Sequence, residues 1–136
     1  MSPFLPLEEL GKAAEWRPDA KRLASVVVDE NYIAVSQDAA WLSYSAAERA
    51  TAQVNKKIRL LRDYQVAAAR ELQQAALPGK HRFLFEMATG TGKTLLSAAI
   101  AKLYLRTENA TRILFTRKRR GAGRRLMGRV RVLRCR

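Results

Sequence analysis

The stretch Met-Ala-Thr-Gly-Thr-Gly-Lys-Thr, residues 87–94, limits what this chain can fold into more than any other feature. It lies between the apolar run Arg-Phe-Leu-Phe-Glu-Met, residues 82–87, and a largely apolar segment, residues 93–106. The first run is continuous rather than alternating, which predicts a buried strand, and the second has apolar residues at helical spacing. Residues 112–116 predict a second strand. Strand, loop, helix and strand form a parallel βαβ unit, so we expect an α/β fold.

A loop that leaves a parallel strand and enters a helix directs backbone N–H groups at one point, where the helix dipole favours phosphate. Two glycines allow a close approach of the backbone, Lys93 can reach the β- and γ-phosphates, and the Thr94 hydroxyl can bind Mg²⁺. The stretch is therefore predicted to be a P-loop, although Met87 stands where the first glycine is usual. The alternative is a Gly-Thr-rich turn without a ligand, which the predicted flanking elements disfavour. The expected ligand-binding residues are Thr89, Gly90, Thr91, Gly92, Lys93 and Thr94.

Together with residues 61–72, Leu-Arg-Asp-Tyr-Gln-Val-Ala-Ala-Ala-Arg-Glu-Leu, this loop resembles superfamily 2 helicases and translocases of the DEAD/DEAH type. In these proteins a glutamine motif precedes the P-loop, and the first glycine of the loop is often replaced. The resemblance implies that Gln65 recognises adenine, with Arg62 and Tyr64 beside it. An amide suits that role because it offers one donor and one acceptor. The alternative for Gln65 is a solvated helix residue.

Within the superfamily, the motifs are most similar to the restriction-subunit and UvrB-like group, which includes the motor subunit of type I restriction endonucleases. The resemblance covers residues 61–116 and implies a partial RecA-like lobe. It also implies ATP and Mg²⁺ as cofactors and DNA as the partner, in a parent that couples ATP hydrolysis to movement on DNA. A different P-loop NTPase, such as a small kinase, is the more remote alternative.

Hydrolysis needs an acidic pair and arginines in addition to phosphate binding. Only Glu108 is acidic after Thr94, so we expect no catalytic residue in this chain and no turnover of ATP by it alone. The stretch Val-Val-Val-Asp-Glu-Asn-Tyr, residues 26–32, imitates the missing acidic motif, but it lies upstream of the loop and predicts a hairpin turn instead. Residues 1–60 contain no Glu-x-Lys, so we expect no nuclease centre there.

The charge is concentrated at the C-terminal end. The formal net charge is +14, and residues 117–136 hold ten basic residues and no acid. We expect this Arg-rich tail to be disordered, and two hypotheses account for it. The chain is a truncated or frameshifted product that follows the family to about Thr116, or it is a small basic protein that binds nucleic acid through its tail.

Before the lobe, residues 1–60 predict a small α+β segment. It comprises a helix over residues 8–16, a hairpin over residues 25–36 and a helix over residues 39–58. A further helix within residues 61–77 ends before Pro78-Gly79. The sequence has no apolar run long enough for a membrane span and no signal layout, and its one cysteine, Cys135, forms no internal disulfide, so we expect a cytoplasmic location.

Overall fold

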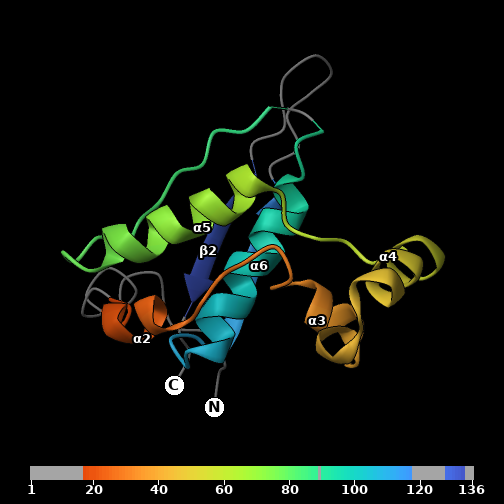
Figure 1. Ribbon diagram of the computed structural model, residues 1–136. Coiled ribbons are helices and arrows are strands. Elements are labelled where there is room, and N and C mark those ends of the chain that lie inside the picture. The colour runs from red at the N-terminus through yellow and green to blue at the C-terminus, as the bar shows by residue number, and fades with distance from the viewer. Residues whose placement is uncertain (1–16, 89, 118–127, 134–136) are drawn as a thin grey trace, which may run out of the picture.

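The computed structural model describes residues 17–88, 90–117 and 128–133, and these residues are mostly helical (Figure 1). The helices are α2 (Ala20–Ser25), α3 (Ala34–Gln37), the 3₁₀ turn η1 (Trp41–Ser43), α4 (Ala46–Asn55), α5 (Asp63–Ala76) and α6 (Lys93–Arg106). The strands are β1 (Arg112–Arg117) and β2 (Gly128–Leu133). None of the described helices is both long and apolar enough to cross a membrane.

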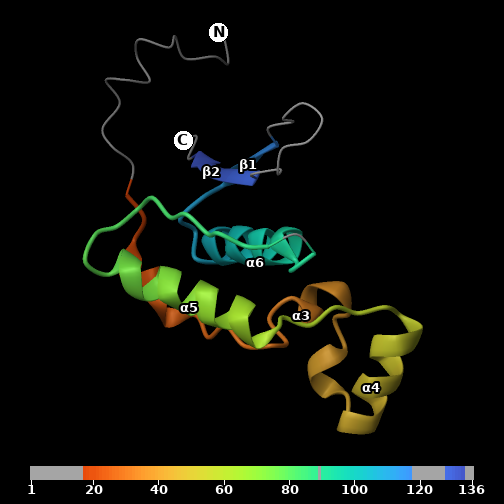
Figure 2. The same cartoon turned by 90° about the horizontal axis from the view of Figure 1, so that it is seen from above.

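The main core lies around α5 and α6. Figure 2 shows α6 between α5 and the β1–β2 pair. The apolar residues of α6 recur at helical spacing, as predicted, and Leu96, Ile100 and Leu103 are all buried. Burying one such side chain contributes about 1.5–3 kcal/mol. This face fixes α6 against the core and thereby fixes the loop that precedes it.

The predicted end of α5 is also confirmed. The helix ends at Ala76, and Gly79 follows with a φ of +105°, a conformation that favours glycine. The chain then runs extended through residues 80–88 towards the loop.

A second, smaller core joins α3, η1 and α4 and is built around Trp41. The helix expected over residues 39–58 is shorter than predicted, because Ser45 begins a new helix. The Ser45 hydroxyl accepts a hydrogen bond from the Glu48 N–H, and the Glu48 carboxylate accepts one from the Ser45 N–H at 2.7 Å. This reciprocal cap separates α4 from η1.

The predicted hairpin over residues 25–36 is wrong. Asp29 does form a turn, accepting a hydrogen bond from the Asn31 N–H on its side chain at 2.9 Å, but α3 follows in place of a returning strand. The preceding valines lie against α5 instead. Gln73 Nε2 donates to the Val26 carbonyl at 2.8 Å, and Arg70 Nε donates to the Val28 carbonyl at 3.1 Å. Side chains of a helix therefore satisfy backbone groups for which we had predicted a cross-strand partner.

The strand predicted at residues 112–116 is confirmed as β1, but the parallel βαβ arrangement is not. β1 pairs antiparallel with β2, in a register that places Ile113 opposite Val132. Residues 82–87, predicted as a buried strand, form neither a helix nor a strand and belong to no sheet in the described part of the chain. An antiparallel partner can be reached through a short connection, whereas parallel strands need a long crossover. Residues 128–133 are thus a strand where we had expected disorder.

The other expectations for the ends fall on residues 1–16, 118–127 and 134–136. The helix predicted over residues 8–16 and the rest of the Arg-rich tail lie outside the described residues.

Candidate functional site

The loop before α6 has the backbone conformation that its glycines predict. Gly90 has a φ of +79° and Gly92 a φ of +81°. The Gly92 carbonyl accepts the first helical hydrogen bond, from the Leu96 N–H at 3.1 Å. Among the described residues, no group accepts a hydrogen bond from the N–H groups of residues 93–95, and the first turn of α6 holds no acid. The N–H donors of the first turn and the positive end of the helix dipole thus meet at one point.

The cationic and hydroxyl side chains expected at this point are present there. Lys93 is half-buried and Thr94 is exposed at the first two positions of α6. The Thr91 hydroxyl instead donates within the loop, to the Ala88 carbonyl at 2.5 Å. Thr89, also predicted as a phosphate ligand, lies outside the described residues.

Gln65 lies behind the loop rather than on the surface of α5. Its side chain is 1% exposed, so it is not the solvated helix residue of the alternative interpretation. Its Nε2 donates to the Gly92 carbonyl at 3.0 Å and to the Thr91 carbonyl at 3.3 Å, while its Oε1 accepts from the Arg62 N–H at 2.9 Å. Both amide donors are therefore used, and one acceptor position of Oε1 remains.

Two neighbours of Gln65 extend this contact. The Tyr64 hydroxyl donates to the Thr91 carbonyl, and Arg62 Nη1 donates to that hydroxyl at 3.3 Å. The sequence motif grouped Arg62, Tyr64 and Gln65, but it did not reveal that two of them hydrogen-bond the loop backbone directly. Only their spatial proximity to residues 91–92 shows it.

Met87, the departure from the usual loop pattern, has a packing role. It is half-buried and contacts the main core, as do Phe83 and Phe85. An apolar side chain at this position continues the core-facing side of the extended segment, which a glycine could not do.

The titratable groups of α6 whose pKa is shifted lie away from the loop. Burial raises the pKa of Tyr104 to about 12. Burial also lowers the pKa of Lys102, and the positive charge of nearby Arg106 lowers it further. Glu108, the one acid after Thr94, follows the other end of α6 and pairs with Arg22 at 3.5 Å. In the described part of the chain no cluster of His, Cys, Asp or Glu could hold a metal ion.

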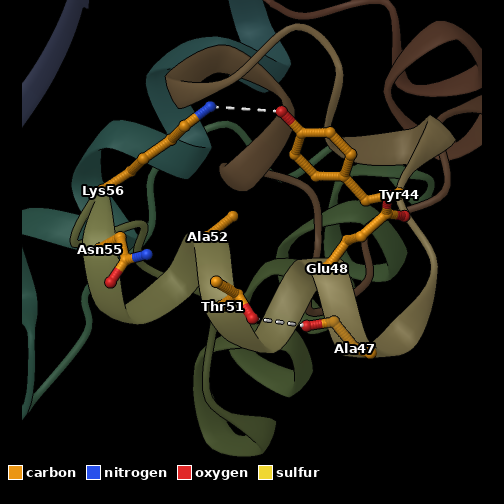
Figure 3. A pocket seen from close by; sticks show the side chains of 7 residues that line it. All are labelled: Tyr44, Ala47, Glu48, Thr51, Ala52, Asn55 and Lys56. Carbon is orange, nitrogen blue, oxygen red and sulfur yellow. Dashed lines mark hydrogen bonds between the residues drawn. The ribbon is translucent and has the colours of Figure 1, made fainter.

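A separate open hollow of about 390 Å³ lies along α4 (Figure 3). Lys56 and Tyr44 both line the hollow, and the Lys56 Nζ donates a hydrogen bond to the Tyr44 hydroxyl at 3.2 Å. None of the residues of the loop before α6 lines this hollow, so the two places are distinct.

The resemblance to superfamily 2-type restriction helicases, which the loop and the Gln65 stretch indicate in the sequence, is confirmed by the comparison with known families. The model of the family "Type III restriction enzyme, res subunit" matches residues 58–128, and the chain belongs to this family. The chain is also 38% identical, over 68 residues, to the type I restriction enzyme EcoKI endonuclease subunit of Escherichia coli strain K12. That match covers 50% of this chain and 6% of the relative. No solved structure matches the chain significantly.

Proposed function

We propose that residues 61–116 are the first part of a RecA-like ATP-binding lobe of a superfamily 2 DNA translocase, similar to a type I restriction motor. The observation that carries this proposal is the group of three N–H donors at residues 93–95, which have no acceptor among the residues that the structure describes and lie beside Lys93 and Thr94. Such a helix start binds phosphate through aligned donors and the helix dipole.

Each residue of the loop has a role in this proposal. Gly90 and Gly92 let the backbone approach the phosphates, Lys93 neutralises the γ-phosphate, and Thr94 holds Mg²⁺. A Cβ added to Gly90 would meet no atom within 4 Å, so the loop is open on that side. Thr91 would join the cradle only by exchanging the hydrogen bond from its N–H to the Ala88 carbonyl, at 3.4 Å, for one to a phosphate oxygen. Bound ATP and Mg²⁺ supply the phosphoryl chemistry, and these residues bind and orient it.

Gln65 would recognise adenine by exchanging one contact. Its Oε1 has a free acceptor position for the adenine amino group, but Nε2 has to release one loop carbonyl to donate to the ring. The longer bond, to the Thr91 carbonyl at 3.3 Å, is the one we expect to break. Guanine presents a carbonyl where adenine presents the amino group, so ATP should compete for the site better than GTP.

Binding of a fluorescent ATP analogue with Mg²⁺ tests the proposal on the full chain. Replacing Lys93 by Ala should weaken binding by about 10- to 100-fold. This factor corresponds to the free energy that a hydrogen bond to a charged group usually contributes. Lys21→Ala removes the same charge from exposed α2 and should leave binding unchanged. Binding that is absent, or that responds equally to both substitutions, would refute the P-loop assignment.

The chain alone should not turn ATP over. Its one acid after the loop, Glu108, pairs with Arg22 at the far end of α6, so no carboxylate there can orient water on a bound phosphate. Movement on DNA, and the other subunits of a restriction enzyme, belong in this proposal to a longer protein. In an assay of phosphate release from ATP, with and without duplex DNA, the chain should therefore give the same rate as buffer without protein.

A second candidate function is nucleic-acid binding by residues 117–136, favoured by ten basic residues without an acid. Each phosphate contact with duplex DNA contributes about 0.9 to the slope of log affinity against log salt. The paired substitution Arg119→Gln and Arg120→Gln should reduce that slope if the tail binds. An unchanged slope would exclude those two residues as phosphate contacts and weaken the case for this function.

A further inference from the structure

The two carbonyl groups that accept hydrogen bonds from Gln65 Nε2 each have a second donor. The Gly92 carbonyl also accepts from the Leu96 N–H at 3.1 Å, the first hydrogen bond of α6. The Thr91 carbonyl also accepts from the Tyr64 hydroxyl. A carbonyl oxygen has two lone pairs, so each of these carbonyls can accept from both of its donors. Either contact of the Gln65 amide can therefore be released without leaving a carbonyl group unpaired.

The contacts of the Tyr64 hydroxyl fix the direction in which it donates. A phenolic hydroxyl has one hydrogen to donate, and its oxygen also accepts. Arg62 Nη1 donates to that oxygen at 3.3 Å, and the hydroxyl hydrogen is directed at the Thr91 carbonyl. The guanidinium charge strengthens this donation, because hydrogen bonds in a chain polarise one another. The Tyr64 side chain is 44% exposed, so it contributes to the loop through its hydroxyl more than through buried ring surface.

The Tyr64 hydroxyl becomes important when Gln65 releases the Thr91 carbonyl. In the function proposed above, on which this inference rests, Gln65 Nε2 leaves that carbonyl to donate to the adenine ring. We propose that Tyr64 is a positioning residue for this exchange, because its hydroxyl keeps the Thr91 carbonyl hydrogen-bonded while the amide turns to the base. The loop then retains its conformation, and binding of adenine leaves no carbonyl without a partner. Tyr64 thus acts on recognition of the base through Gln65 and needs no contact with the nucleotide.

A ligand without a base separates this role from a purely structural one. Inorganic tripolyphosphate offers a chain of three phosphates but no adenine, so it binds without the exchange and leaves Gln65 on the Thr91 carbonyl. Tyr64→Phe removes only the hydroxyl. It should weaken binding of Mg–ATP by about 2- to 10-fold, the factor that corresponds to the loss of one neutral hydrogen bond. Binding of Mg–tripolyphosphate should stay the same.

Isothermal titration calorimetry of the full chain measures both affinities directly. Tyr44→Phe is the matched control, because it removes a hydroxyl that accepts from Lys56 at 3.2 Å, away from the loop. This control should alter neither affinity. In a Gln65→Ala background no amide turns to the base, so Tyr64→Phe should no longer change the ratio of the two affinities.

The side-chain NH₂ resonances of Gln65 provide a readout that needs no variant. Addition of Mg–ATP should shift them in the NMR spectrum of the full chain, because one donor changes its acceptor. Addition of Mg–tripolyphosphate should leave them in place. Equal shifts with the two ligands would show that the amide does not turn to the base, which would overturn the exchange and the role of Tyr64 with it.

The affinity measurements distinguish failure of this inference from failure of the proposed function. If tripolyphosphate does not bind to the original chain, the phosphate site is refuted, and both proposals are overturned. If tripolyphosphate binds and Tyr64→Phe weakens both ligands equally, the hydroxyl only stabilises the loop, and the positioning role alone is overturned. An ATP-specific loss that persists in the Gln65→Ala background would also overturn that role, because it would not depend on Gln65.

Discussion

Gln65 and Gly92 are in direct contact, because the Gln65 Nε2 donates to the Gly92 carbonyl oxygen at 3.0 Å. The contact joins the start of α5 to the residue that begins α6. It leaves no room for a larger residue in the loop, because a Cβ at position 92 would collide with the same Nε2 atom. The start of α5 and the loop before α6 are thus one packed unit.

Replacing Gln65 by Ala should lower the free energy of unfolding by about 1–3 kcal/mol, since it leaves the Arg62 N–H without its acceptor and removes one donor from the carbonyls of Thr91 and Gly92. Urea denaturation monitored by circular dichroism measures this loss. Gln74→Ala, an exposed position on the same helix, is the matched control and should change stability by less than about 0.5 kcal/mol. Equal effects at the two positions would show that the buried amide contributes little.

The two loop glycines should differ in their tolerance of alanine. Both have a left-handed φ, so alanine strains either position by about 1 kcal/mol. At Gly90 a Cβ meets nothing within 4 Å, whereas at Gly92 it collides with Gln65. Gly92→Ala should therefore be the more destabilising by a further 1–3 kcal/mol or so, a typical overpacking cost. Urea denaturation of the two variants checks this order, and a larger loss for Gly90→Ala would contradict the packing described here.

We expect the hydrogen bonds of Asn109 to stabilise the contact between the residues before α2 and the C-terminal end of α6. It is 5% exposed, its Oδ1 accepts from the Asp19 N–H at 2.5 Å, and its Nδ2 donates to the Thr107 hydroxyl at 2.8 Å. Asn109→Ala should cost about 1–3 kcal/mol, because buried polar groups lose their partners. It should also speed amide hydrogen exchange at Leu23, on the α2 helix that Asp19 caps. The exposed Asn55→Ala serves as the control.

The Asp38–Lys56 pair should make stability sensitive to acid. The hydrogen bond from Lys56, at 2.9 Å, and that from the Ala40 N–H hold the pKa of Asp38 below its usual value of 3.8. A carboxyl whose folded-state pKa is depressed stabilises the fold above the usual value and loses that contribution as the pH falls through the lower one. Titration of the Asp38 carboxyl carbon by NMR should give a midpoint below 3.8, rising in Lys56→Met. A midpoint that does not change on that substitution would remove Lys56 as the cause.

Residues close in sequence determined the parts of the fold that the sequence predicted well. The apolar spacing in α6 and the Pro78-Gly79 stop after α5 act within one or two turns, so their effect is visible without a tertiary structure. The loop motif likewise carries its glycines, Lys93 and Thr94 in one continuous stretch. These features suffice to indicate the family, which the comparison confirms, and they predict a phosphate-binding loop.

Tertiary contacts decided the remainder, because the groups involved are distant in sequence. Valines 26–28 have the composition of a strand, yet Gln73 and Arg70 of α5 donate to the carbonyls of Val26 and Val28, and no hairpin forms. β1 was predictable as a strand, but its partner was not, since any strand of compatible pattern can complete a ladder. Gln65 could be either an exposed residue or a buried one until the fold brought the carbonyls of residues 91–92 to its amide. Propensity and periodicity act locally, whereas the pairing of buried polar groups depends on which distant backbone atoms the fold brings within hydrogen-bonding distance.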